Sequence, residues 1–324
     1  MNGEPVVVAD GLRKCYGDLA AVDGISFQVG RGEIFGMVGP NGAGKTTTVE
    51  CVEGLRRPDA GRVAVLGLDP WQDAPTLRER MGVQLQTASL PQRIKVGEAL
   101  GLFASFYRQP ADGNALLARL GLGEARKQYV SQLSGGQRQR LFVTLALINR
   151  PEVVFLDELT TGLDPQGRRA AWDLVREIRT GGATVVLTTH FMDEAERLCD
   201  RVAIVDRGRI VALDAPAALV RRLGDEARIV FEADGDLNAA TLGVLDGVRR
   251  VARDGERVIV YGGSLAAVVN TLEAGGVRFR NLRTEGPNLE DVFLALTASG
   301  APRGQGSDRQ EPGRGVPERR RRAQ

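Results

Sequence analysis

The sequence predicts an α/β fold built on a mixed β-sheet and followed by a smaller α+β unit. Residues 34–46 read as a short apolar strand, a glycine-rich turn and the start of a helix. Residues 153–156 are a continuous apolar run that ends in Asp157 and Glu158, as expected of a parallel strand buried on both faces, and residues 183–189 form the next strand, which ends at His190. Residues 225–298 alternate strand and helix candidates in the order β-α-β-β-α-β, which is typical of a small two-layer domain.

The composition is that of a globular protein with no obvious electrostatic partner. A length of 324 residues suggests about two domains, with 43% hydrophobic residues and a net charge of +2. Residues 301–324 hold seven arginines against three carboxylates, a net charge of +4, so the remaining chain sums to −2. We therefore predict no specific nucleic-acid partner.

Cysteine use and hydropathy bear on the compartment. Cys15, Cys51 and Cys199 are far apart and form no C-x-x-C pair, which favours reduced thiols in a cytosolic protein. No apolar run approaches the roughly 18–20 residues that span a bilayer, and the N-terminus lacks the pattern of a signal peptide. We expect a soluble chain unless another protein tethers it.

The first motif in the chain is Tyr16, before Gly17. It lies in a turn-rich stretch between expected strands at 6–9 and 25–29. An accessible tyrosine could stack on a nucleotide base. Taken alone, however, such a residue is more often a packed strand end.

The second motif is the phosphate loop of residues 39–46, with the spacing G-x-x-x-x-G-K-T. Gly42 and Gly44 let backbone N–H groups crowd around a polyphosphate at a positive helix end. Lys45 can reach the β- and γ-phosphates, and the Thr46 hydroxyl can ligate Mg²⁺. The alternative is an ordinary glycine-rich turn, but a chance match arises in roughly one sequence in a hundred. Nucleotide binding is favoured.

The next stretch turns mostly helical and is broken by Gly, Pro and Gln. A short strand at 82–86 ends at Gln86. The expected elements around it are a strand at 63–66 and helices at 75–80, 98–107 and 115–120.

Residues 133–137 read Leu-Ser-Gly-Gly-Gln and precede an apolar helix at 141–148. Ser134 is a good N-cap, and the glycines leave backbone donors free for an anion. For Ser-Gly-Gly alone, a simple capped helix start is the favoured interpretation.

Two further apolar strands end in chemistry-bearing residues. Asp157 and Glu158 close the first, at the sheet edge where open α/β folds bind ligands. There Asp157 would hold Mg²⁺ through its hydration shell and Glu158 would orient or deprotonate water, whereas the alternative is a solvated acidic turn. A helix at 165–178 leads to the second strand and to His190, the one histidine of the chain. A lone histidine is usually a packing or surface residue, but this one could hydrogen-bond a γ-phosphate. A helix at 193–199 and a strand hairpin at 202–205 and 209–212 follow.

Together these motifs resemble, over residues 1 to about 220, the nucleotide-binding subunit of an ATP-binding cassette (ABC) transporter. The fold implied is the ABC type of phosphate-loop NTPase, with a mixed sheet core and a helical subdomain at about 88–150. The resemblance identifies Tyr16 as the adenine-stacking aromatic, residues 39–46 as Walker A, Gln86 as the Q-loop glutamine and residues 133–137 as the signature. Residues 153–158 match Walker B, Leu163 and Asp164 the D-loop, and His190 the switch histidine.

The resemblance implies a full set of site residues and two cofactors, ATP and Mg²⁺. The catalytic residues implied are Glu158, His190, Gln86 and Lys45, and the metal ligands are Thr46, Gln86 and Asp157. The nucleotide-binding residues implied are Tyr16, Gly39, Asn41, Gly42, Gly44, Lys45, Thr46, Thr47, Ser134, Gly135, Gly136, Gln137 and Asp164. The family usually has proline after the catalytic glutamate, where this chain has Leu159; this removes no catalytic atom.

The remaining chain divides into an accessory α+β domain at 225–298 and a tail at 299–324. The accessory domain contains no catalytic cluster. Residues 287–297 resemble the C-terminal end of efflux ATPases of the daunorubicin-exporter type. The Arg/Gly/Pro-rich tail is predicted to be disordered.

These resemblances imply an ATPase that couples ATP hydrolysis in a head-to-tail dimer to export of a drug or antibiotic-like substrate. Its partners would be a membrane permease and a second copy of itself or a related ABC subunit, at the cytoplasmic face of the membrane. Lipid or polysaccharide export is an alternative that the motifs leave open. A soluble ABC ATPase in translation or DNA repair usually has two cassettes or a long coiled coil, and neither is found here. Intact Gln86, Glu158 and His190 argue against a regulatory module without turnover.

Overall fold

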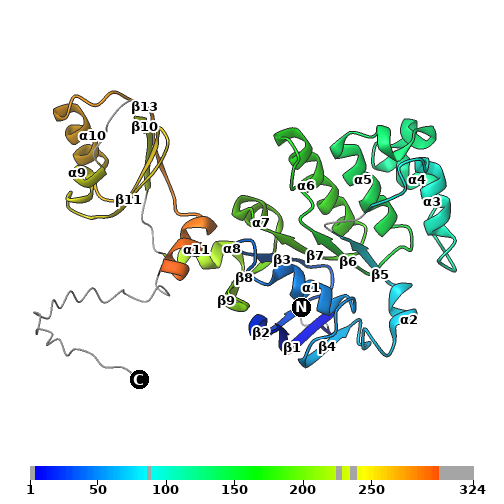
Figure 1. The fold of residues 1–324 in the computed structure, drawn as a ribbon. Coiled ribbons are helices and arrows are strands. Elements are labelled where there is room, and N and C mark those ends of the chain that lie inside the picture. The colour runs from blue at the N-terminus through cyan, green and yellow to red at the C-terminus, as the bar shows by residue number, and fades with distance from the viewer. Residues whose placement is uncertain (1–3, 86–88, 224–227, 234–238, 299–324) are drawn as a thin grey trace, which may run out of the picture.

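The computed structural model describes residues 4–85, 89–223, 228–233 and 239–298. The larger part of the molecule contains two β-sheets with helices around them, and a smaller sheet with two helices lies to one side (Figure 1). Helices α8 (Pro216–Arg221) and α11 (Leu289–Ala298) lie between the two parts (Figure 1).

The central sheet has the strand order β5-β6-β7-β3-β8-β9. All neighbours pair in parallel except β8 and β9, which are antiparallel. Every residue of β3, β6 and β7 is buried, because helices or a second sheet cover both faces. The six strands are β3 (Ile34–Val38), β5 (Met81–Gln84), β6 (Val153–Asp157), β7 (Thr184–Thr189), β8 (Arg201–Asp206) and β9 (Arg209–Asp214).

A second, antiparallel sheet has the order β2-β1-β4. Its strands are β1 (Val7–Tyr16), β2 (Leu19–Val29) and β4 (Ala60–Val65). The expected turn-rich stretch between residues 9 and 25 is wrong, because β1 and β2 form one long hairpin. Irregular pairing shifts the register after Ala9, and Gly11 and Gly24 have positive φ there. These irregularities interrupt the alternation by which a strand is recognised in sequence.

Helix α1 (Lys45–Val52) lies between the two sheets and contributes Val49 and Val52 to their shared core. The opposite face of the central sheet packs on α6 (Pro165–Thr180) and α7 (Met192–Leu198). The short helix α2 (Ala74–Arg78) precedes β5.

A helical layer extends from the β5 edge (Figure 1). It contains α3 (Val96–Ala104), α4 (Gly113–Arg119) and α5 (Gly135–Ala146), with 3-10 turns at Gly123–Lys127 and Val130–Gln132. Leu100, Leu117 and Leu141 pack together in its own core. The helix predicted at 98–107 corresponds to α3, which begins two residues earlier and ends three residues earlier than predicted.

The smaller unit is a four-stranded antiparallel sheet in the order β11-β12-β10-β13. The predicted β-α-β-β-α-β order is found, and α9 and α10 cover one face (Figure 1). The elements are β10 (Arg228–Ala233), α9 (Ala239–Gly243), β11 (Val248–Asp254), β12 (Arg257–Gly262), α10 (Leu265–Ala274) and β13 (Phe279–Glu285). The domain boundaries at 1–220 and 225–298 and the helical subdomain at about 88–150 stay predictions, and the tail at 299–324 lies outside the described residues.

Helix α11 returns from the smaller sheet to the larger part of the molecule. Leu289 and Val292 are buried in the same core as α6 and α7. The Leu289 backbone N–H donates to the Glu196 carboxylate on α7 at 3.2 Å. Helix α11, which follows the smaller sheet in sequence, is therefore part of the core beside the central sheet. No helix among the described residues is long and apolar enough to cross a membrane.

We predict that Leu289→Ala destabilises the part of the protein around the central sheet. Leu289 is 0% exposed, and a buried Leu→Ala change costs about 2–5 kcal/mol. Urea denaturation followed by tryptophan fluorescence measures this loss, because Trp172 lies in the same core. Leu296→Ala is the matched control on the same helix, since Leu296 is 38% exposed. Equal effects of both changes would contradict the shared core.

Candidate functional site

The phosphate loop connects β3 to α1, at the centre of the sheet. The Lys45 side chain is 4% exposed and folds back along the loop. Its Nζ donates to the carbonyl oxygens of Gly39 at 2.9 Å and Pro40 at 3.0 Å. Burial lowers the pKa of Lys45, while the nearby Glu158 and Asp157 carboxylates oppose that shift.

Gly42 and Gly44 of this loop are glycine for different reasons. Gly44 has φ +102°, and a Cβ there would lie 2.2 Å from the Ala21 carbonyl oxygen, so the chain itself excludes a side chain. Gly42 also has a positive φ, +79°, but a Cβ there would meet no protein atom within 4 Å. The space beside Gly42 is open to a ligand.

The N-terminus of α1 is suited to bind an anion. No side chain caps the helix at Gly44. The first backbone N–H groups of α1, at the positive end of the helix dipole, are therefore available to hydrogen-bond an anionic ligand. Thr46 and Thr47, in the first turn, are half-buried. The arrangement suits the phosphates of a nucleotide.

Asp157 ends β6 and reaches the start of α1. The Thr46 hydroxyl donates to its Oδ1 at 3.4 Å, and the Thr188 hydroxyl of β7 donates to the same oxygen. Burial raises the pKa of Asp157, and the hydrogen bond from Thr188 opposes the shift. A buried carboxylate and a hydroxyl this close are the hard oxygen donors that Mg²⁺ prefers, so these residues fit that ion. The described residues contain no cluster of three or more His, Cys, Asp or Glu side chains that could hold a metal.

Glu158 follows directly and has a left-handed backbone, with φ +49°. Its Oε1 lies 3.4 Å from His190 Nδ1, and its Oε2 accepts from the Thr161 hydroxyl at 3.2 Å. The side chain is 8% exposed. A left-handed conformation is uncommon outside glycine and asparagine and is concentrated at functional sites. Glu158 and His190, which the sequence singled out separately, are therefore neighbours in the fold.

Tyr16 ends β1 and is 43% exposed. The Arg56 guanidinium lies 5.4 Å from its ring centroid. Ala21 on β2 lies beside Gly44 of the phosphate loop. The β1–β2 hairpin therefore borders that loop. Tyr16 is accessible, as base stacking requires.

The signature residues lie in a separate place. The Ser134 hydroxyl accepts from Gln137 N at 3.2 Å, and the Gln137 side chain accepts from Ser134 N at 2.9 Å. This capping box starts α5. Opposite it, Asp164 caps α6 by accepting from Gly167 N at 2.7 Å.

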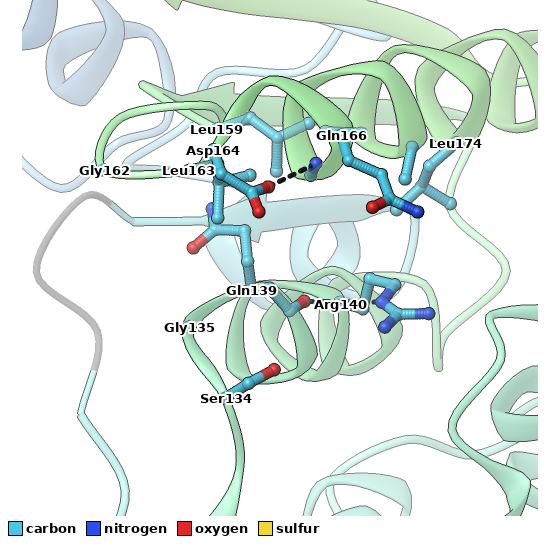
Figure 2. Close-up of a pocket in the computed structure, with 14 residues that line it drawn as sticks. Ser134, Gly135, Gln139, Arg140, Leu159, Gly162, Leu163, Asp164, Gln166 and Leu174 are labelled. Atoms are coloured by element: carbon cyan, nitrogen blue, oxygen red, sulfur yellow. Dashed lines mark hydrogen bonds between the residues drawn. The ribbon is translucent and has the colours of Figure 1, made fainter.

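Ser134, Gly135, Gly136 and Asp164 line one pocket of about 620 Å³ (Figure 2). Among the residues lining it there is no lysine, no Glu158 and no His190. One chain thus brings Lys45, Thr46, Asp157, Glu158 and His190 into one group and leaves the signature and Asp164 in another.

Two other predicted residues remain. Asn41 is exposed, and with Gly39 and His190 it lines a different pocket, of about 500 Å³. Gln86 lies outside the described residues.

Thr188 and Thr161 contact the two acidic side chains but were not predicted from the sequence. Thr188 is a buried hydroxyl, 2% exposed, near the end of an apolar strand, and that pattern could have singled it out. Thr161 lies in a loop and carries no such signal.

Comparison with known proteins agrees with these motifs. The ABC transporter family profile matches residues 22–161. The chain is 39% identical over 306 residues to the daunorubicin resistance ATP-binding protein DrrA3 of Streptomyces coeruleorubidus, covering 91% of this chain and 96% of that protein. It is 39% identical over 310 residues to the Nod factor export ATP-binding protein I of Ralstonia nicotianae, covering 92% and 95%.

Among solved structures, an ATP-binding subunit of an ABC transporter superposes with a TM-score of 0.62 at 27% identity. The match covers 68% of this chain and 93% of that one. The predicted α/β phosphate-loop fold is confirmed. The chain therefore belongs to the ABC transporter family, as an ATP-binding subunit with ATPase activity.

Proposed function

We propose that this subunit powers an exporter of drug- or antibiotic-like molecules through a separate membrane permease, at the cytoplasmic face of the membrane. The observation that carries the proposal is the contact of Glu158 and His190 beside the phosphate loop, at 3.4 Å. It supplies a base for hydrolysis next to the phosphate site. The name of the daunorubicin resistance relative supports the cargo class.

Binding of ATP rests on three parts of the chain. Lys45 and the N–H groups at the start of α1 would hold the phosphates, and Tyr16 would stack on the adenine. Lys45 must leave the Gly39 and Pro40 carbonyls to reach a γ-phosphate, which is a small movement of a flexible side chain. Thr46 and Asp157, with Gln86, would hold Mg²⁺, which when bound neutralises charge on the phosphoryl group being transferred.

Hydrolysis rests on Glu158. Its Oε2 is held by Thr161 and its Oε1 faces His190, so the carboxylate is oriented before substrate arrives. The carboxylate would accept the proton of the attacking water. His190 would hydrogen-bond the γ-phosphate while its Nδ1 keeps Glu158 in place.

A second subunit completes the site in this proposal. Gly135 and Gly136 have no positive φ, and a Cβ at either would meet nothing within 4 Å. Nothing in the described part of their own chain requires glycine at these two positions. We therefore expect a molecule outside the chain to approach their backbone closely. A nucleotide held by the phosphate loop of another copy, or of a related ABC subunit, would meet these backbone atoms.

The permease would dock at a groove between the helical layer and the central sheet. This cavity of about 550 Å³ is lined by Leu77, Val83, Phe103, Phe106 and Tyr107 among others. Phe106 is 64% exposed, whereas Leu100 on the preceding helix α3 is 4% exposed and belongs to the core of the helical layer. An exposed aromatic at the rim of an apolar groove suits a helix from a membrane partner.

A second cargo class has comparable support. A relative named for Nod factor export is as similar, at 39% identity, as the one named for daunorubicin resistance. Lipid or polysaccharide export, which the sequence motifs leave open, is the alternative. The cargo path would lie in the permease, so transport assays with the permease decide between the two.

We predict that Lys45→Ala loses ATP binding and that Glu158→Gln keeps it. The glutamine retains shape but not the negative charge beside the water, and general-base assistance typically contributes ~10²–10⁴-fold to rate. ATPase rates and nucleotide-binding titrations measure the two effects. Glu177→Gln, on the exposed face of α6, is the control and should leave both unchanged. Near-normal turnover of Glu158→Gln would refute its catalytic role.

We predict that Glu158→Gln forms a dimer with ATP and Mg²⁺, and that adding Gly135→Val abolishes it. Valine projects into space that only the partner would use, so ATP binding and thermal stability should stay near those of the parent. Size-exclusion chromatography with ATP gives the oligomeric state. Gly101→Val is the matched control, because Gly101 is also helical with nothing within 4 Å of its Cβ. A dimer that survives Gly135→Val would contradict the shared site.

We predict that Phe106→Glu prevents copurification with the permease while sparing ATP binding. A charge at the groove rim would have to be desolvated on docking. Affinity purification from solubilised membranes that hold both proteins measures the association. Val244→Glu is the control, since Val244 is 83% exposed and remote from the groove. Unchanged copurification of Phe106→Glu would place the permease elsewhere.

A further inference from the structure

A second cavity lies where α11 meets the smaller sheet. Its volume is about 240 Å³, and its walls include Leu223, Arg228, Arg250, Tyr261, Pro287 and Leu294. It shares no lining residue with the phosphate loop. The ATPase function does not account for it.

The polar side of this cavity is one row of residues across the sheet. Tyr261 on β12 pairs directly with Arg250 on β11 and with Arg228 on β10, and Arg228 pairs with Glu285 on β13. Residues directly opposite one another point to the same face. Their neighbours Ile229 and Val260 pack in the core under α9 and α10. The row therefore faces the other way, toward α11 (Figure 1).

The carboxylates near this row are already engaged by arginines, and Glu285 also accepts from Arg283 Nε at 2.6 Å. Arg228 is 8% exposed, and its Nη1 and Nη2 donate to Asp291 at 3.1 Å and to Glu285 at 2.7 Å. Its buried Nε has no hydrogen-bond partner among the described residues. Asp291 and Glu285 thus offset the charge of Arg228 and leave little for other cations.

Arg250 is the other cation of this row, and Arg249 also lines the cavity. Its guanidinium lies 5.3 Å from the Tyr261 ring centroid. Within the described part of the chain, Arg250 has no ion pair with a carboxylate. A stacked, outward-facing guanidinium beside an aromatic ring and an apolar wall can still bind an anion through its N–H groups.

We propose that this cavity binds a small aromatic carboxylate. The aromatic body would lie against Tyr261, Pro287 and Leu294, and the carboxylate would pair with Arg250. The arginines disfavour a cation. The volume is below the roughly 300–1,000 Å³ of pockets for drug-sized ligands, so a compact acid fits and a large export cargo does not.

The test is fluorine NMR on the full-length protein with para-trifluoromethylbenzoate as the probe. ADP in excess occupies the nucleotide site. Given the small size of the probe, we expect a Kd on the order of 1 mM, seen as line broadening. The isosteric amide and the isosteric benzylamine should each bind at least tenfold more weakly. Equal broadening by all three probes would overturn the proposal.

Two variants place the probe. Arg250→Gln should weaken binding of the carboxylate about tenfold and leave the amide unchanged. Ala295→Trp should block both, because Ala295 lines the cavity and faces outward from α11. Arg253→Gln, on the same strand but outside the cavity, is the matched control and should bind as the parent does. Binding that survives both Arg250→Gln and Ala295→Trp would overturn the site.

Discussion

The structure depends on the parallel register of three buried strands. In β6 and β7, Asp157 pairs with Thr188, and in β3 and β7, Val38 pairs with Thr189. This register brings the phosphate loop, the acidic pair and His190 to one edge, although more than a hundred residues separate Lys45 from Asp157. A slip of one residue would turn every side chain of a strand to the other face. Burial on both faces makes such a slip costly, so the same packing that stabilises the sheet also fixes the geometry of the site.

Short apolar runs and loop motifs were enough to predict this core, since β6 and β7 carry the hydrophobic runs 153–156 and 185–187 and β3 leads directly into the phosphate loop. The β1–β2 hairpin was missed for a local reason. Gly11 and Gly24, with positive φ, accompany irregular pairing that breaks the alternation of the strands. Helix α3 ends at Ala104, three residues before the predicted end of the helix at Tyr107. Phe106 instead lies exposed beside the groove.

The separation of Ser134 from Lys45 was expected only from the family resemblance, which implies a head-to-tail dimer. Spacing in sequence cannot say that Ser134 and Asp164 face each other while Lys45 and Glu158 lie elsewhere. That depends on how the helical layer packs on the sheet. Thr188 and Thr161 were missed because hydroxyls become informative only when register and loop geometry bring them to a carboxylate. The left-handed Glu158 likewise has no signature in sequence, since most positions with positive φ in the described segments are glycines.

Helix α11 joins the two parts of the protein physically. Leu289 and Val292 are buried beside the central sheet, while Asp291 of the same helix pairs with the buried Arg228 of the smaller sheet. Breaking a buried ion pair by removing one partner typically costs about 3–5 kcal/mol. Leu294 lines both the cavity with Arg250 and the pocket that contains Asn41 and His190. The smaller unit is therefore coupled to the larger part through α11, because any displacement of this helix changes the walls of both cavities.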